Sequence, residues 1–124
     1  MKIITTEKAP AAIGPYSQAI QADNGMVWLS GQIGLDAATG ELKEGLEEQT
    51  KQIFKNIEGV LEAAGLTKIN IVKTTVFVTN IGDFLKVNDL YSQFFGGHKP
   101  ARSTVEVSSL PKGAIIEIEV LAVK

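Results

Sequence analysis

The C-terminal part of the chain places charged side chains inside segments that otherwise resemble buried strands. Arg102 lies in ARSTVEV, and Glu117 and Glu119 lie in AIIEIEVLAV. A charge that leaves water needs a partner and hydrogen bonds, so these side chains either face solvent or hold something that justifies their burial. The planar fork of an arginine suits bidentate binding of a carboxylate, and a glutamate can accept a proton or orient water. Arg102 and Glu117 therefore predict a site for a small carboxylate, with a structural cross-strand salt bridge as the alternative.

Strand alternation suggests how these two side chains meet. Arg102 and Thr104 share one face of the penultimate strand. Ile115 and Glu117 share one face of the last strand, because side chains alternate along a strand. If SSLPKG closes an antiparallel hairpin between these strands, a register that sets Arg102 beside Glu117 is available, although the sequence alone does not fix it.

A glycine inside a predicted strand marks a second candidate position. Gly31 lies in WLSGQ, and alternation places it on the same strand face as Val27 and Leu29. Glycine weakens a strand and often marks a bulge or the close approach of a ligand. The backbone amides of Ser30 and Gly31 are therefore candidate donors to an anion or a carbonyl, and a plain bulge is the alternative.

Two further side chains are candidates for contacting a ligand. Tyr16 begins a predicted strand and offers a ring with a hydroxyl, although a core or interface tyrosine is the alternative. Asn88 lies one helical turn after Phe84 and one turn before Tyr91, at the edge of an apolar stripe, and otherwise is a surface asparagine of the helix. His98, the only histidine, receives no role.

Composition limits the classes of function. The 124 residues carry 12 basic and 14 acidic side chains, and a pI near 5.4 gives no electrostatic footprint for nucleic acid or an anionic membrane. The absence of cysteine excludes disulfides and thiolate chemistry, and a single histidine excludes a histidine metal cluster. No apolar run reaches the roughly 18 residues of a membrane span, and no secretory signal is evident. We therefore expect one cytoplasmic domain over residues 1–124.

Periodicity predicts the elements that position these residues. Apolar residues recur at helical spacing over 46–64 and again over 84–95, and β-branched or alternating runs occupy the segments around them. The predicted order is β-β-β-α-β-α-β-β, an α+β domain with one mixed sheet and both helices on one face. The last strand is apolar on both of its sides, so we expect another subunit to cover the second face.

Four sequence blocks carry a resemblance to a known family. IGPYSQA, LSGQIG, KPARSTVEV and LPKGAIIEIEVLA together resemble the Rid (YjgF) family, in particular its RidA-like 2-iminobutanoate/2-iminopropanoate deaminases, over essentially the whole chain. The resemblance implies a chorismate-mutase-like fold, a homotrimer with clefts between subunits, and hydrolysis of 2-imino acids to 2-oxo acids and ammonia without a metal or organic cofactor.

The resemblance also implies roles for individual residues. Arg102 matches the arginine that binds the substrate carboxylate, and Glu117 matches the acid that orients or activates water. The positions that match the lining of the cleft are Tyr16, Ser30, Gly31 and Asn88. Thr104 stands where many relatives have a cysteine in PARSCVEV, which rules out a nucleophilic thiol here and leaves the pocket volume and the preferred imino acid open.

Two other classes of function remain as alternatives. A regulatory protein could use the same cleft to sense a 2-oxo acid or an amino acid without turning it over. An RNA-directed activity, also attributed to parts of this family, is disfavoured by the acidic pI and by the lack of a basic and aromatic surface run.

Overall fold

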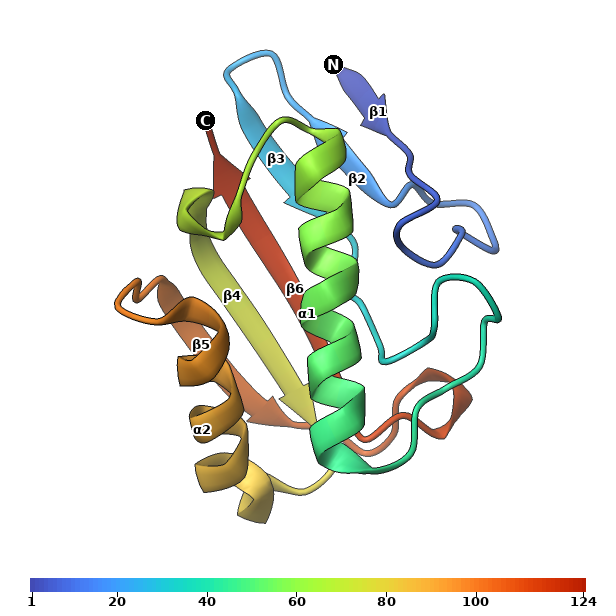
Figure 1. Ribbon diagram of the computed structural model, residues 1–124, viewed down its shortest axis with the longest axis vertical. Helices are drawn as coiled ribbons and strands as arrows, with labels where there is room; N and C mark the ends of the chain where they lie inside the picture. Colours follow the sequence, from blue (N-terminus) through green and yellow to red (C-terminus); the bar gives the residue numbers. More distant parts are fainter.

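The computed structural model describes all 124 residues as one mixed sheet covered on one side by two helices (Figure 1). The elements follow the predicted order β-β-β-α-β-α-β-β, with short 3₁₀ turns between some of them. The strands run in the spatial order β1-β2-β3-β6-β4-β5. Their bounds are Lys2–Ile4 (β1), Ala19–Gln21 (β2), Met26–Leu29 (β3), Ile71–Val78 (β4), Ala101–Glu106 (β5) and Ile116–Val123 (β6).

Both helices form where the apolar period predicts them. Helix α1 spans Gly45–Ala63 and buries Ile53, Ile57 and Leu61 against the sheet. Helix α2 spans Phe84–Phe95 and ends at Gly96, whose φ of 62° lies in the left-handed region that glycine adopts without strain. Neither helix combines the length and the apolar character that a membrane span requires.

The last two strands do not form the antiparallel hairpin that SSLPKG could have closed. Strand β5 pairs with β4 in parallel, and β4 pairs with β6 in antiparallel fashion, so β4 lies between β5 and β6. Helix α2 forms the crossover from β4 to β5, and a helical crossover leaves its two strands parallel. The segment that was expected to close a hairpin instead leads past the end of β4 to β6.

The sheet has one covered face and one open face. Alternate residues of β6, including Ile116, Ile118 and Val120, are buried beneath the helices. The opposite face of β6 carries Glu117, Glu119, Leu121 and Val123, all at least partly exposed. On the same open face Trp28 pairs with Leu121 and keeps 54% of its surface exposed. Nothing within one chain covers this apolar part of the sheet, as the pattern of the last strand indicates.

Candidate functional site

The structure places Arg102 and Glu117 on opposite faces of the sheet. Arg102 pairs with Thr74 of β4 and shares its helix-covered face, whereas Glu117 pairs with Phe77 and faces the open side. Neither Arg102 nor Glu117 belongs to any ion pair of the chain. The expected side-by-side pair is therefore wrong within one chain, and so is its structural alternative, a salt bridge between these two residues. The physical reason is β4, which separates their strands.

Glu117 lies in a pocket that also contains three other predicted residues. The pocket has a volume of about 360 Å³ and is lined by Glu117, Tyr16, Ser30 and Gly31 together with the apolar N-terminal loop at Pro10–Ile13. Burial, and to a smaller extent the charge of Glu119, raises the pKa of Glu117 above its ordinary value. A carboxyl group with a raised pKa in a pocket is a better proton acceptor than an exposed glutamate.

Gly31 lies directly against the carboxyl group of Glu117. A Cβ atom at position 31 would stand 2.5 Å from Oε2 of Glu117 and 2.9 Å from its Cδ. Strand alternation predicted Gly31 on the face of Val27 and Leu29, and this prediction is wrong. The register changes by one residue between the pair of Trp28 with Leu121 and the bridge of Gln32 with Ile118, which turns Gly31 to the open face.

The amides of Ser30 and Gly31 differ in their availability. The Ser30 amide donates to the Gln18 carbonyl at 3.0 Å, and the Ser30 hydroxyl donates to the Ser17 carbonyl at 2.6 Å. The Gly31 amide donates to no group of the chain. Gly31 therefore supplies a free backbone donor beside Glu117, and Ser30 shapes the pocket wall. Tyr16 lies in the loop before β2 with half of its surface exposed, and its hydroxyl accepts a long hydrogen bond from the Ile13 amide.

Gln18 organises the pocket and was not singled out from the sequence. Its side chain is buried, accepts a hydrogen bond from the Thr6 amide at 2.7 Å, and donates to the carbonyls of Thr6, Ala9 and Pro10. These bonds fasten the N-terminal loop over the pocket. A glutamine in a predicted strand carries no sign of such a role, since its partners lie 8 to 12 residues away in a loop without periodicity.

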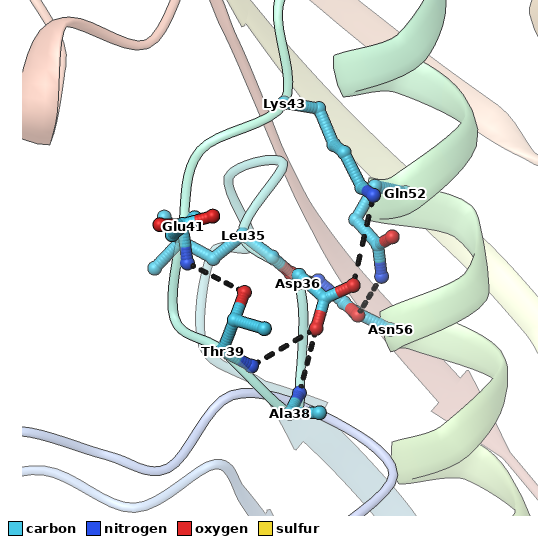
Figure 2. Close-up of polar contacts among 8 residues, drawn as sticks. All are labelled: Leu35, Asp36, Ala38, Thr39, Glu41, Lys43, Gln52 and Asn56. Atoms are coloured by element: carbon cyan, nitrogen blue, oxygen red, sulfur yellow. Dashed lines mark hydrogen bonds and ion pairs between the residues drawn. The ribbon is translucent and has the colours of Figure 1, made fainter.

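Buried amides of α1 fasten the opposite wall of the pocket. Asn56 is fully buried, donates to the Leu35 carbonyl at 2.9 Å, and accepts a bond from Gln52 at 2.8 Å (Figure 2). Ile33 and Leu35 line the pocket from the loop that this helix holds. The loop is also braced by Asp36, whose carboxylate accepts bonds from two backbone amides of its own turn and lies 3.6 Å from Lys43.

The other predicted residues gather between β5 and α2. The guanidinium carbon of Arg102 lies 4.7 Å from the ring centre of Tyr91 and 5.6 Å from that of Phe84. The guanidinium N–H groups of Arg102 donate no hydrogen bond and join no ion pair within the chain. Nearby on the same two elements, Asn88 Oδ1 and Thr104 Oγ1 are buried and have no hydrogen-bond partner. Buried polar atoms without partners are rare, and an ordered water, a ligand or a partner chain would satisfy them.

The predicted site residues thus form two separate clusters on opposite faces of the sheet. We call Tyr16, Ser30, Gly31 and Glu117 the carboxylate half-site, and Asn88, Arg102 and Thr104 the arginine half-site. No group of three or more His, Asp or Glu side chains is arranged to hold a metal ion. One face of this small α+β protein therefore carries an unpaired guanidinium with free polar neighbours, and the other face carries a carboxyl group of raised pKa beside a free backbone amide.

Comparison with known proteins gives the family. Residues 6–124 match the family model described as endoribonuclease L-PSP, and the chain belongs to this family, also known as YjgF/Rid. The human 2-iminobutanoate/2-iminopropanoate deaminase is 48% identical over 124 residues, covering 99% of this chain and 90% of the human protein.

Solved structures of family members have the same fold. A protein of the conserved Rid family from Yersinia pestis is 56% identical, with a TM-score of 0.96, over 99% of this chain and 98% of that one. TdcF from E. coli, whose crystal structure contains bound serine, is 42% identical with a TM-score of 0.94, over 100% of this chain and 99% of that one. The predicted family and the predicted mixed α+β architecture are therefore confirmed.

Proposed function

We propose that the protein is a hydrolytic deaminase of small 2-imino acids such as 2-iminopropanoate and 2-iminobutanoate. Its active site would form where the arginine half-site of one copy meets the carboxylate half-site of another. The single observation that carries this proposal is the state of Arg102, a half-buried guanidinium with no internal partner beside two unpartnered buried oxygens. The names of the mammalian relatives support the choice of substrate class.

The exposed apolar surface supports contact between different faces of two copies. Exposed apolar side chains flank each half-site: Ile13 and Tyr16 at the carboxylate half-site, and Phe84, Leu85 and Val105 at the arginine half-site. An interface between two different patches closes into a ring when its rotation permits. A homotrimer, as the family resemblance implies, would give three such sites and cover the open face of the sheet.

Binding in this site begins with the substrate carboxylate. The planar fork of Arg102 would bind both carboxylate oxygens, a geometry that arginine favours. The bound serine of TdcF carries a carboxylate next to a nitrogen-bearing carbon, as a 2-imino acid does. The free amide of Gly31 and the hydroxyl groups of Tyr16 and Thr104 are left to contact the rest of the substrate. Positioning of this kind removes much of the entropic barrier to reaction with water.

Hydrolysis then needs one proton acceptor. Glu117 takes a proton from water as the water oxygen bonds to C2 of the imine, and the π electrons of C=N move to the nitrogen. The nitrogen receives this proton from Glu117, which gives a carbinolamine. Glu117 then takes the proton of the carbinolamine hydroxyl and passes it to the nitrogen, so that the C–N bond breaks with ammonia as the leaving group while C=O forms. The products are a 2-oxo acid and ammonia, so no covalent intermediate with the protein is required. A raised pKa suits Glu117 to both directions of proton transfer.

A coupled assay tests the proposal. A serine dehydratase generates 2-aminoacrylate, and the disappearance of its imine tautomer is followed with and without the protein. We expect wild type to accelerate the loss of the imine and the release of ammonia, and Glu117→Gln to have lost this acceleration. Binding of 2-oxo acids without any acceleration would instead identify a regulatory protein that uses the same site.

A further inference from the structure

Beneath Arg102 lies a hydrogen-bonded pair that the deaminase mechanism does not use. The hydroxyl groups of Thr74 and Tyr91 lie 2.8 Å apart and are buried. Thr74 is the cross-strand neighbour of Arg102, and the ring of Tyr91 lies under its guanidinium at 4.7 Å. Three elements, β4, β5 and α2, therefore converge on one guanidinium group.

We propose that Thr74 and Tyr91 are positioning residues that fix the guanidinium plane of Arg102 for binding a carboxylate. A guanidinium over an aromatic face is attracted by the ring and keeps its in-plane N–H groups free for a ligand. The inference rests on the proposed function, because it assigns these two residues a role in the same site. The ligand contacts proposed for that site include neither Thr74 nor Tyr91.

The ring of Tyr91 is held in place from several sides. Phe95 lies 4.6 Å from it and Phe54 6.0 Å, both measured between ring centres, and the Thr74 hydroxyl fixes its distal end. A ring that cannot turn presents a constant face to the cation. Phe84, at 5.6 Å from the guanidinium and more exposed, adds a second aromatic contact at the edge of the protein surface.

The charge state of Tyr91 agrees with this role. Burial raises the pKa of the Tyr91 phenol, against smaller opposite effects of the Thr74 hydrogen bond and the charge of Arg102. The phenol therefore remains neutral in the working range and does not form an ion pair with the guanidinium. A neutral, fixed ring leaves the whole positive charge of Arg102 available to the substrate.

Three variants separate positioning from simple packing. Tyr91→Leu removes the ring under Arg102. Tyr91→Phe together with Thr74→Val keeps the ring and the core volume but removes the bond that holds it, and losing both partners leaves no buried polar group unpaired. The third variant, Arg102→Ala, removes the guanidinium group. In this background Thr74 and Tyr91 have no guanidinium to position.

The first measurement is the kinetics of imine hydrolysis and the affinity for 2-oxobutanoate. We expect Tyr91→Leu to raise KM and Kd about 3- to 30-fold, the range of a partly desolvated cation–π contact, with a much smaller change in kcat. The Tyr91→Phe/Thr74→Val double variant should raise KM less while unfolding near the wild-type temperature. In the Arg102→Ala background neither change should reduce affinity further.

The second measurement observes the guanidinium itself and does not depend on activity. In ¹⁵N-labelled protein we expect the Arg102 side-chain N–H signals to shift or broaden in Tyr91→Leu and in the double variant. If wild type binds 2-oxobutanoate through Arg102 but hydrolyses no imine, the proposed function fails and the positioning role is judged from Kd. Unchanged affinity and unchanged Arg102 signals in Tyr91→Leu would overturn the inference, as would an equal loss of affinity in the Arg102→Ala background.

Discussion

At the scale of single residues, Arg102 is a half-buried cation that forms no ion pair within the chain and lies over the rings of Tyr91 and Phe84. A structural ion pair would have given it a carboxylate partner, and the chain supplies none. The buried, unpartnered oxygens of Asn88 and Thr104 lie on the same two elements. The free N–H groups of Arg102 are therefore open to a ligand.

The first prediction concerns the geometry of Arg102. Arg102→Lys should fail to restore activity although it keeps the charge, because an ammonium group lacks the planar fork. Arg102→Ala should weaken transition-state binding by roughly 2–5 kcal/mol, the range for truncating one member of a desolvated charge pair. Both variants should unfold near the wild-type temperature and keep the wild-type oligomer size. Near-normal turnover by Arg102→Lys, or inactivity of Arg102→Ala that unfolding explains, would contradict the binding role.

The second prediction concerns Glu117. Glu117→Gln should still bind 2-oxo acids but lose most turnover, because the amide keeps the shape and removes the proton acceptor. In wild type the rate should rise with pH through the raised pKa of Glu117, above the ordinary glutamate range, and this rise should vanish in the variant. The control is Glu119→Gln, an exposed neighbour on the same strand face. Loss of activity in the control with normal activity in Glu117→Gln would show that the wrong carboxylate was chosen.

The raised pKa of Glu117 also affects the stability of the folded protein. A carboxyl group whose pKa is raised by folding stabilises the folded state while protonated, and this contribution is lost as pH rises through the folded pKa. At neutral pH Glu117 is therefore a destabilising residue. Glu117→Gln should unfold at a higher temperature than wild type at pH 7, with a difference that shrinks as the pH falls.

The third prediction tests the contact between Gly31 and Glu117. A methyl group at position 31 would overlap the Glu117 carboxyl group, and the backbone there has no positive φ to oppose alanine. Since a carboxyl group at the end of a flexible side chain can move aside, Gly31→Ala should reduce activity much more than thermal stability. Gly97→Ala is the matched control, because a Cβ there meets nothing within 4 Å. Equal activity of the two variants would exclude close packing of Gly31 as a requirement of the site.

At the scale of elements, α1 does more than cover the sheet. Its buried amides hold the loop that forms one wall of the pocket, with Asn56 bonded to the Leu35 carbonyl and Gln49 bonded to the Lys43 carbonyl and the Ile115 amide. A purely apolar helix face would pack as well on the sheet. The polar residues on the buried side of α1 are thus explained by the carbonyl and amide groups that they satisfy.

The fourth prediction follows from Asn56. Asn56→Ala leaves the Leu35 carbonyl without its partner in a buried setting, which costs roughly 1–3 kcal/mol of unfolding free energy. Because the freed loop carries Ile33 and Leu35 of the pocket, KM should also rise. Lys55→Ala, on the exposed side of the same helix, should change neither. Denaturant unfolding and imine hydrolysis measure the two effects, and a destabilised variant with unchanged KM would limit Asn56 to a structural role.

At the scale of the whole molecule, the proposed active site requires an assembly of copies, because the two half-sites lie on opposite faces of one sheet. Each chain exposes the apolar face of its sheet around Trp28, and Leu85 next to the arginine half-site keeps 81% of its surface exposed. Exposed apolar surfaces favour contacts between proteins, and the proposed trimer would cover them. Light scattering should give about three times the 13.3 kDa of one chain, and a stable monomer would contradict the shared site.

The fifth prediction tests the shared site directly. Arg102→Ala and Glu117→Gln chains are each inactive alone, but a mixed assembly pairs the intact Arg102 of one chain with the intact Glu117 of another. After the two variants are refolded together in equal amounts, about one quarter of the sites should be intact. Each site receives an intact Arg102 from one chain in about half of the cases and an intact Glu117 from the other chain in about half of the cases, and both must occur together. Different affinity tags on the two chains verify that mixed assemblies form. Mixed assemblies without activity would exclude a site made from two copies.

The local pattern of the sequence determined the order of elements and the extent of both helices. Apolar spacing predicted helices at 46–64 and 84–95, and the structure has them at Gly45–Ala63 and Phe84–Phe95. It also determined the two faces of the last strand, because alternation depends only on neighbouring residues. Residue types and the family blocks pointed to Arg102 and Glu117 as the chemically active pair.

Only the tertiary structure decided where those residues lie. Whether β6 pairs with β5 or with β4 depends on which strand edges remain free after the β4–α2–β5 crossover, and no local period encodes that choice. A one-residue change of register turned Gly31 toward Glu117, and Gln18 holds a loop whose contacts are distant in sequence. The sequence therefore predicted which groups react, and long-range strand pairing separated these groups onto two faces of the sheet, because β4 stands between their strands.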